Sequence, residues 1–155
     1  MSQTPIRILF VCHGNICRST MAEFVLKDMV ARRGLTEQFH IESAATSTEE
    51  IGNPVHPGTA AVLREHGIGG FEVKRARQLR RADYDAFDFI IGMDTANIRN
   101  MNWILGGDPD GKVFKLLEFA GTSRSVDDPW YTGDFETTYA DVCDGCEGLL
   151  GYLGF

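Results

Sequence analysis

The N-terminal part of the chain contains Ile6-Arg-Ile-Leu-Phe-Val-Cys12, a nearly continuous apolar run, followed directly by His13-Gly-Asn-Ile-Cys-Arg-Ser19. A short apolar run that ends in turn-forming residues predicts a parallel strand buried on both faces. Beyond it, apolar side chains recur at helical intervals over residues 21–29. Thr20 and Glu23 have the spacing of a capping box at the start of this helix. The opening unit is therefore predicted to be a strand, a loop and a helix.

The rest of the chain continues the alternation of strands and helices. Further strands are expected over residues 39–45, 87–93 and 112–117. Helices are expected over residues 58–66, from an Asp94 cap towards Leu105, and from about Asp134 onward, where glycines at 145, 148, 151 and 154 leave the end open. This alternation predicts a parallel sheet with helices on both faces. We expect one α/β domain of three layers over residues 1–155.

Charge and length narrow the classes of function. The 155 residues carry 15 Lys+Arg and 22 Asp+Glu, a net charge of −7, and residues 127–155 contain acidic side chains but no Lys or Arg. A net-acidic chain repels polyphosphate, so no nucleic-acid partner is expected. The N-terminal apolar run is too short for a membrane span or a signal peptide, so no membrane partner is expected either. Four cysteines do not make a disulfide scaffold, which favours a reducing cytoplasm.

The loop after the first predicted strand carries the candidate chemistry. Five residues separate Cys12 from Arg18, so backbone N–H groups can curl around a phosphate-sized dianion at the helix start. Arg18 can add a bidentate fork to two phosphate oxygens. Cys12 would lie beneath the ligand as a thiolate, a nucleophile that needs no neighbouring base. The spacing alone is a weak signal, but its place between strand and helix, with Gly14 permitting close approach, makes it stronger.

A second segment offers the proton that such chemistry needs. Thiolate attack on a phosphomonoester requires protonation of the leaving oxygen. Asp128 is a candidate acid because Pro129 restrains it to an extended conformation. Trp130 and Tyr131 follow directly and can form the wall of a cleft. The neighbouring Asp127 is more simply an exposed loop residue.

At these residues the chain resembles the low-molecular-weight protein tyrosine phosphatases over nearly its full length. The matching pieces are Val11-Cys-His-Gly-Asn-Ile-Cys-Arg-Ser19, Ser43-Ala-Ala45, Gly52-Asn-Pro54, Ala76-Arg-Gln78, Met93-Asp94, and Asp128-Pro129 with its aromatics. The resemblance implies a four-stranded parallel sheet in the order 2-1-3-4, with helices on both faces and no cofactor or metal. It implies that Cys12 forms a cysteinyl-phosphate, that Arg18 clamps the phosphate, and that Asp128 serves as acid and then as base.

The resemblance also implies the roles of other residues and the partners. The phosphate-binding loop would comprise His13, Gly14, Asn15, Ile16, Cys17, Arg18 and Ser19. Asn15 and Ser19 resemble residues that hold the loop and hydrogen-bond the thiolate. Cys17 is a candidate redox partner that would protect Cys12 through a reversible disulfide, or else a structural part of the loop. The substrates would be tyrosine-phosphorylated proteins or peptides, acted on by a monomer that can form a weak dimer.

Three positions depart from the family pattern. Glu49 stands where an aromatic residue usually forms one wall of the substrate cleft, opposite Trp130 and Tyr131. Lys74 stands where a histidine often supports the phosphate loop, so that contact is expected to be missing or replaced. Trp130 stands where tyrosine is common, which keeps an aromatic wall but removes a hydroxyl.

Two other activities are known on the same fold. Protein arginine phosphatases carry threonine at the position of Ile16, and isoleucine leaves no hydroxyl there to orient a guanidinium group. Thiol-linked arsenate reductases need two further cysteines in the region of residues 80–95, which has none. Cys143 and Cys146 have the spacing of half a zinc site, but without a second pair we expect them to lie in the core.

Overall fold

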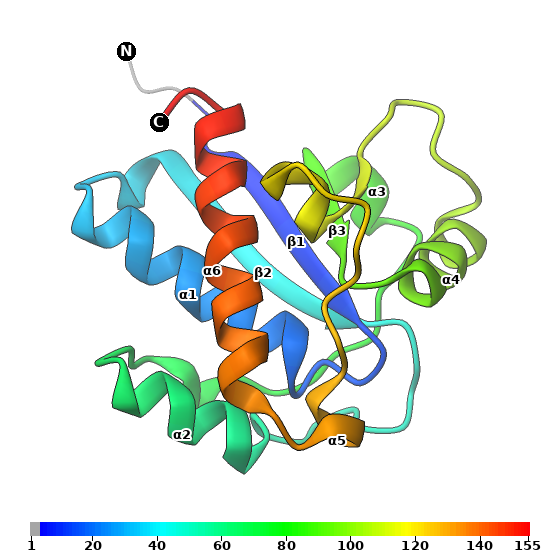
Figure 1. Cartoon of the computed structure of the whole chain (residues 1–155). Coiled ribbons are helices and arrows are strands. Elements are labelled where there is room, and N and C mark those ends of the chain that lie inside the picture. Colours follow the sequence, from blue (N-terminus) through cyan, green and yellow to red (C-terminus); the bar gives the residue numbers. More distant parts are fainter. Residues whose placement is uncertain (1–3) are drawn as a thin grey trace.

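The computed structural model describes residues 4–155 and has a four-stranded, all-parallel sheet. Its strands are β1 (Ile6–Cys12), β2 (Phe39–Ala45), β3 (Phe89–Gly92) and β4 (Val113–Lys115). Their order in the sheet is β2-β1-β3-β4, so the predicted order 2-1-3-4 is confirmed (Figure 1). The two later strands are shorter than predicted, and the segment after β4 turns directly into the 3-10 helix η3 (Leu116–Ala120).

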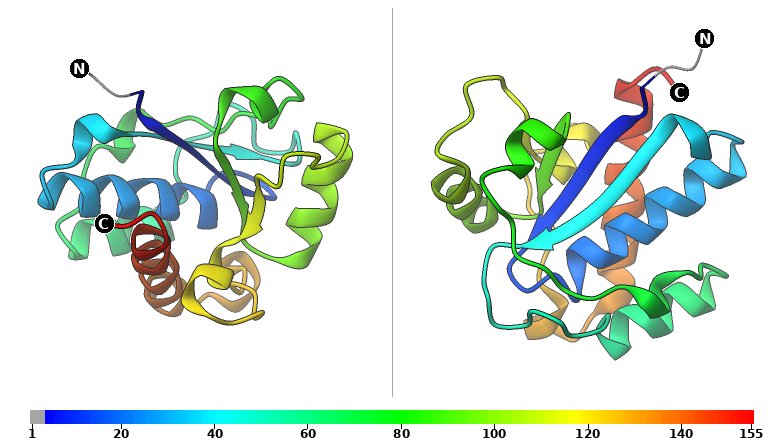
Figure 2. Two further views of the ribbon diagram at one scale, coloured as in Figure 1. Left: turned by 90° about the horizontal axis from the view of Figure 1, so that it is seen from above. Right: turned by 180° about the vertical axis from the view of Figure 1, so that it is seen from behind.

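Helices cover both faces of the sheet, as predicted. One face carries α1 (Arg18–Arg32), α2 (Pro57–Glu65) and α6 (Phe135–Tyr152), and the other carries α3 (Asp83–Ala86) and α4 (Thr95–Leu105) (Figure 2). Short helical turns complete the chain: η1 (Thr36–Gln38), η2 (Phe71–Val73) and α5 (Pro129–Thr132). Within residues 4–155, no helix combines the length and apolar character that crossing a bilayer requires.

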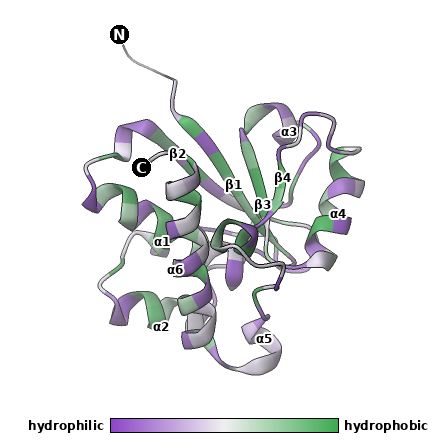
Figure 3. Ribbon diagram, turned by 45° about the horizontal axis from the view of Figure 1, so that its top comes forward, coloured by the Kyte–Doolittle hydropathy of each residue, from purple (hydrophilic) through white to green (hydrophobic). Residues whose placement is uncertain are grey.

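The apolar run of β1 is explained by its place in the middle of the sheet. Ile8 and Phe10 pack into the core under α1 and α6, whereas Leu9 and Val11 pack into the core under α4. A strand covered on both faces needs apolar residues at successive positions instead of alternating ones. Figure 3 shows the mostly apolar strands, with helices whose polar residues alternate with apolar ones.

The predicted capping box at the start of α1 is wrong. The helix begins at Arg18, so Thr20 and Glu23 both lie inside it. The Thr20 hydroxyl donates to the carbonyl of Cys17 at 3.1 Å, and the buried Glu23 carboxylate accepts a hydrogen bond from Ser43 on β2. The loop leads directly into the helix, and neither side chain caps it: Thr20 bonds to the end of the loop and Glu23 to the neighbouring strand β2.

Helix α6 continues through three of the glycines that weaken it and ends at Tyr152. Two of them allow η3 to approach closely. A Cβ atom at Gly145 would lie 2.4 Å from Cγ of Leu116, and one at Gly148 would lie 2.0 Å from the carbonyl oxygen of Phe119. The low helix propensity of glycine is therefore offset by packing that a larger residue would prevent.

Candidate active site

The loop between β1 and α1 lies at the carboxyl end of the sheet, on the side of the molecule where α5 lies (Figure 1). Cys12 ends β1, and only 3% of its surface is exposed. Its Sγ accepts a hydrogen bond from the backbone N–H of Asn15 at 3.3 Å and lies 3.1 Å from Oγ of Ser19. These two contacts hold the Cys12 sulfur in place at the base of the loop.

Asn15 holds the shape of this loop. Among residues 4–155 it is the only residue other than glycine with a positive φ, +59°. Its buried amide donates to Oγ of Ser19 at 2.8 Å and to Oγ of Ser43 at 2.9 Å, and its Oδ1 accepts from the backbone N–H of Arg77 at 3.2 Å. Because Ser19 accepts from Asn15, its own hydroxyl hydrogen is available to the Cys12 sulfur.

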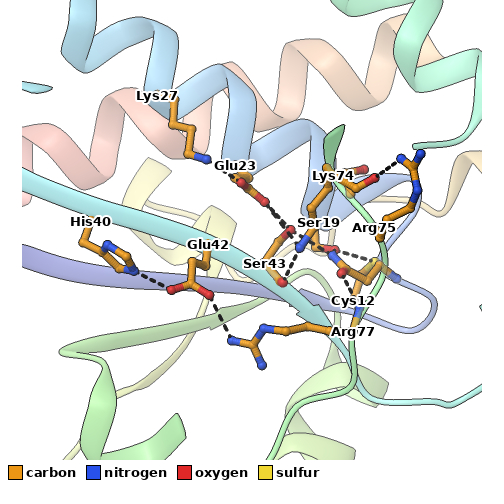
Figure 4. Close-up of polar contacts among 12 residues, drawn as sticks. Cys12, Ser19, Glu23, Lys27, His40, Glu42, Ser43, Lys74, Arg75 and Arg77 are labelled. Carbon is orange, nitrogen blue, oxygen red and sulfur yellow. Dashed lines mark hydrogen bonds and ion pairs between the residues drawn. The ribbon is translucent and has the colours of Figure 1, made fainter. Parts of the chain in front are cut away.

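A buried polar network continues from the loop to α1 and to the segment after η2 (Figure 4). The Ser43 hydroxyl donates to Oε1 of Glu23 at 2.5 Å, and Nζ of Lys27 donates to Oε2 of Glu23 at 2.6 Å. Nζ of Lys74 donates to the Ser43 carbonyl at 2.8 Å and lies 3.8 Å from Oε1 of Glu23. Burial lowers the pKa of Lys74 from its usual value. Lys74 thus supplies its own contact to this network.

Arg18 joins the phosphate loop to two other loops. Its NH1 donates to Oδ2 of Asp94 at 2.7 Å and to the carbonyl of Val126 at 3.0 Å, and its NH2 lies 3.3 Å from Oδ2 of Asp128. Burial disfavours the guanidinium charge, but the Cys12 sulfur and the two carboxylates raise the pKa of Arg18 above its usual value. The side chain is held charged and oriented at the base of the site.

Asp94 makes a contact with the site in addition to the predicted helix cap. As predicted, its Oδ1 caps α4 by accepting from the backbone N–H of Asn97 at 2.7 Å. Its Oδ2 binds Arg18 at the same time. The available signal was its position directly after β3, because the carboxyl ends of parallel strands meet at one edge of a sheet.

Residues 126–131, which contain Asp128 and are called the acid segment below, approach the phosphate loop from the C-terminal part of the chain. Asp128 is the N-cap of α5, and its Oδ1 accepts from the backbone N–H of Trp130 at 3.0 Å. The neighbouring Asp127 is exposed, as predicted. The backbone N–H of Val126 donates to the carbonyl of Met93 at 2.9 Å, which fixes the start of this segment to the end of β3.

These segments enclose a cavity of about 390 Å³. It is lined by Cys12, His13, Gly14, Ile16, Cys17, Arg18, Glu49, Glu50, Asp128, Trp130 and Tyr131. The structure therefore brings the three residues predicted to be catalytic together with the three predicted to form the cleft. Oε2 of Glu49 lies 2.8 Å from Nε2 of His13, within hydrogen-bond distance, and Glu50, which the sequence did not single out, also lines the cavity.

Of the other cysteines, Cys17 lines the same cavity as Cys12, whereas Cys143 and Cys146 lie on α6. Burial, together with the charge of Cys12, raises the pKa of Cys17 to about 12. Cys146 is fully buried and Cys143 packs against the core, which confirms the expectation that this pair belongs to the core. In the described part of the chain, no three His, Cys, Asp or Glu side chains are grouped to hold a metal ion.

The loop can bind a phosphate dianion through its N–H groups and Arg18, directly above a buried thiol and beside a carboxyl group. A parallel sheet that carries this arrangement at its carboxyl edge is the framework of a phosphate-monoester hydrolase.

Comparisons with known proteins name the family. The model of the family "Low molecular weight phosphotyrosine protein phosphatase" matches residues 7–154. The chain belongs to this family. It is 42% identical over 150 residues to the low molecular weight protein-tyrosine-phosphatase YfkJ of Bacillus subtilis, covering 96% of each chain.

Solved structures agree with this assignment. The crystal structure of YfkJ has a TM-score of 0.93 at 40% identity, covering 97% of this chain and 96% of that one. SP-PTP, a low molecular weight protein tyrosine phosphatase from Streptococcus pyogenes, has a TM-score of 0.87 at 42% identity, covering 97% and 94%. A Drosophila arginine phosphatase has a TM-score of 0.86 at 27% identity, covering 97% and 99%.

Proposed function

We propose that this protein hydrolyses phosphotyrosine on proteins and peptides, and simple aryl phosphates, through a cysteinyl-phosphate on Cys12. The observation that carries the proposal is the meeting of three groups at one cavity: the Cys12 sulfur, the Arg18 guanidinium and the Asp128 carboxyl. A nucleophile, a phosphate clamp and a proton donor are the three groups that phosphomonoester cleavage through a thiol requires.

In the first step, the Cys12 thiolate attacks phosphorus, forming the S–P bond while the bond from phosphorus to the phenol oxygen breaks. Arg18 and the backbone N–H groups of the loop bind the non-bridging oxygens and stabilise the charge that they carry in the transition state. Protonated Asp128 donates its proton to the leaving phenolate oxygen. The products are the phenol and the cysteinyl-phosphate.

In the second step, water attacks the phosphorus of the cysteinyl-phosphate and the S–P bond breaks. Asp128, now ionised, accepts a proton from the attacking water, so the same carboxyl group acts as base. The Cys12 sulfur leaves as a thiolate, which the N–H of Asn15 and the hydroxyl of Ser19 stabilise. Release of inorganic phosphate restores the starting state.

The depth of the site favours phosphotyrosine over phosphoserine. Cys12 is almost fully buried at the base, whereas Trp130 and Tyr131 are 58% and 85% exposed near the rim. A phenyl phosphate is long enough to reach the sulfur while its ring contacts these aromatic side chains. Ile16 also lines the cavity and presents no hydroxyl group, which favours a phenol over a phosphorylated guanidinium.

The decisive experiment compares wild type, Cys12→Ser and Asp128→Asn on an aryl phosphate, a phosphotyrosine peptide and a phosphoarginine peptide. Wild type should hydrolyse the first two. Cys12→Ser should be inactive, and Asp128→Asn should lose roughly 10²–10⁴-fold in kcat/KM on phosphotyrosine. No turnover by wild type, or activity retained by Cys12→Ser, would overturn the mechanism. A preference for phosphoarginine would mean that phosphoarginine, and not phosphotyrosine, is the substrate. Unchanged activity of Asp128→Asn would mean that another residue is the general acid.

The proposal extends to the setting in which the enzyme acts. A nucleophilic thiolate must stay reduced to work, which suits the reducing cytoplasm. The mouth of the cavity is formed by one chain, so a monomer suffices for the reaction. Sedimentation of the active protein at increasing concentration tests the monomeric state.

A further inference from the structure

His56 lies between the phosphate loop and the acid segment, and it is the N-cap of α2. Its backbone N–H donates to the carbonyl of Ile16 in the phosphate loop at 2.9 Å. Its ring nitrogen Nδ1 accepts from the backbone N–H of Gly58 at 2.9 Å, which caps the helix and fixes the ring. His56 does not line the cavity, but it is hydrogen-bonded to the phosphate loop, which forms the floor of the cavity.

The fixed ring of His56 contacts aromatic residues from the acid segment and from α6. It stacks on Phe135 at 5.1 Å between centroids and 19° between planes, and it meets the Trp130 ring edge-on at 5.7 Å and 78°. Phe135 in turn packs against Ile16 and Cys17. The Phe135 ring also lies so close to Gly58 that a Cβ there would be 2.5 Å from it.

The contact with Trp130 bears on the proposed acid because Trp130 and Arg18 are the residues bonded to the two oxygens of the Asp128 carboxyl: Oδ1 accepts from the N–H of Trp130, and Oδ2 lies 3.3 Å from NH2 of Arg18. Helix α5 has four residues, and the backbone N–H of Trp130 donates to Oδ1 of Asp128. The Trp130 side chain is more than half exposed, so its ring has few neighbours. Any shift of Trp130 therefore moves the hydrogen bond that orients the Asp128 carboxyl, and small displacements of a catalytic group are costly.

We propose that His56 is a positioning residue that supports Trp130 and thereby holds Asp128 in place to protonate the leaving group. This role rests on the proposed function, because it requires Asp128 to be the acid. It differs from the network beneath the phosphate loop, which orients the nucleophile and leaves the proton donor untouched. The loss of His56 should therefore weaken leaving-group protonation and spare phosphate binding.

The test uses His56→Asn, because asparagine can still accept from the N–H of Gly58 but lacks the ring. kcat/KM is measured on a series of aryl phosphates whose leaving phenols range from acidic to weakly acidic. A weakly acidic phenol needs the proton, whereas an acidic one leaves without it. We expect a loss of about threefold to tenfold for the weakly acidic phenols and almost none for the acidic ones. A uniform loss, or no loss, overturns the role.

The chain offers a matched control at the other end of the same helix. His66 ends α2, stacks on Tyr139 of α6 at 3.9 Å, and lies 3.5 Å from Glu136. His66→Asn removes a similar ring contact between the same two helices without touching the acid segment. Its leaving-group dependence should equal that of wild type. If His66→Asn changes this dependence as much as His56→Asn does, a general displacement of α2 is the cause and the specific role of His56 is overturned.

Two further variants keep the test decisive if His56→Asn folds poorly. His56→Phe keeps a ring and should restore the wild-type leaving-group dependence even where its melting temperature falls for want of the cap. In a Trp130→Ala background, a change at His56 should have no additional effect on that dependence. If the effects of the His56 and Trp130 substitutions on the leaving-group dependence are independent and additive, the positioning role of His56 is overturned. Turnover by wild type with an unaltered His56→Asn profile overturns this inference alone, whereas no turnover by wild type overturns the proposed function and this role together.

Discussion

The two loops that meet at the cavity are built in different ways. In the phosphate loop, the side chains of Cys12, Asn15, Arg18 and Ser19 are all at most 3% exposed and bind groups from other elements. In the acid segment, Trp130 and Tyr131 are largely exposed, and Asp128 bonds to the backbone of its own turn and to Arg18 of the phosphate loop. The difference matches two tasks. The phosphate group is identical in every substrate and suits a rigid cradle, whereas the phenol side varies and suits an adaptable wall.

Arg18 is the point where the two regions touch. Its guanidinium belongs to the phosphate loop, yet it bonds to the carbonyl of Val126 and to the carboxylate of Asp128. These two contacts place the acid segment over the phosphate site without burying it. Variants in the phosphate loop should therefore affect folding and catalysis together, and variants in the acid segment should affect catalysis alone.

The largest expected effect is the difference in thiol reactivity between Cys12 and Cys17. It tests whether Cys17 stays buried in solution, as it is in the structure. A pKa of about 12 leaves only about one Cys17 thiol in 10⁴ ionised at pH 8. Although both residues line the cavity, iodoacetamide should modify Cys12, whose sulfur accepts a hydrogen bond from the N–H of Asn15, and leave Cys17 unmodified because so little of its thiol is ionised. Peptide mass spectrometry over a time course measures both sites. Labelling of Cys17 as fast as that of Cys12 would mean that the loop opens readily.

The next effect is on catalysis at the point of contact. Arg18→Lys keeps the positive charge but loses the planar fork that can bind two phosphate oxygens while contacting Asp94 and Asp128. We expect kcat/KM on phosphotyrosine to fall by about 10²–10³-fold, as for loss of one transition-state donor. Arg124→Lys is the control, since Arg124 makes a bidentate pair with Asp141 outside the cavity. Comparable losses of kcat/KM in both variants would mean that Arg18 has no specific role in catalysis.

Most of the phosphate loop could be predicted from sequence because its features are local. A single continuous stretch, residues 6–32, contains the apolar run of β1, the spacing from Cys12 to Arg18 and the following helix. The partners of that loop could not be predicted in the same way, because they come from distant parts of the chain. Thr59, for example, donates to the carbonyl of Cys17 at 3.1 Å, and nothing in the sequence around Thr59 indicates this contact.

The predictions of where helices begin and end were limited for the same reason: the deciding contacts come from other parts of the chain. Thr20 and Glu23 fit a local capping pattern, but Thr20 bonds to the carbonyl of Cys17 and a tertiary contact with Ser43 binds the Glu23 carboxylate. The glycines at 145 and 148 lower helix propensity locally, but their purpose is to admit η3 against α6. Local patterns predict which element forms, whereas packing decides where it ends and which side chains it uses.

A third effect is on stability, and it tests the rigidity of the phosphate loop. Asn15→Ala forces a non-glycine residue without a polar side chain to keep φ at +59°, and it removes two buried hydrogen bonds and one that is partly buried. We expect the free energy of unfolding to fall by about 2–4 kcal/mol. Asn15→Gly relieves the backbone strain but not the lost bonds, so it should be less destabilised, by about 1 kcal/mol. Urea unfolding measures both, and equal stabilities would show that φ at this position carries no strain.

The smallest effect comes from the acid segment. Trp130→Ala removes an exposed aromatic ring that lines the cavity and contacts His56. We expect kcat/KM on a phosphotyrosine peptide to fall by about tenfold or less, the size of one lost aromatic contact. The free energy of unfolding should change by no more than about 0.5 kcal/mol, as for other surface positions. Trp103→Ala, on the exposed face of α4 and away from the cavity, is the matched control for activity and stability. A loss of stability from Trp130→Ala as large as that from Asn15→Ala would contradict the division of the site, because the acid segment would then be part of the folded framework and not a wall laid against it.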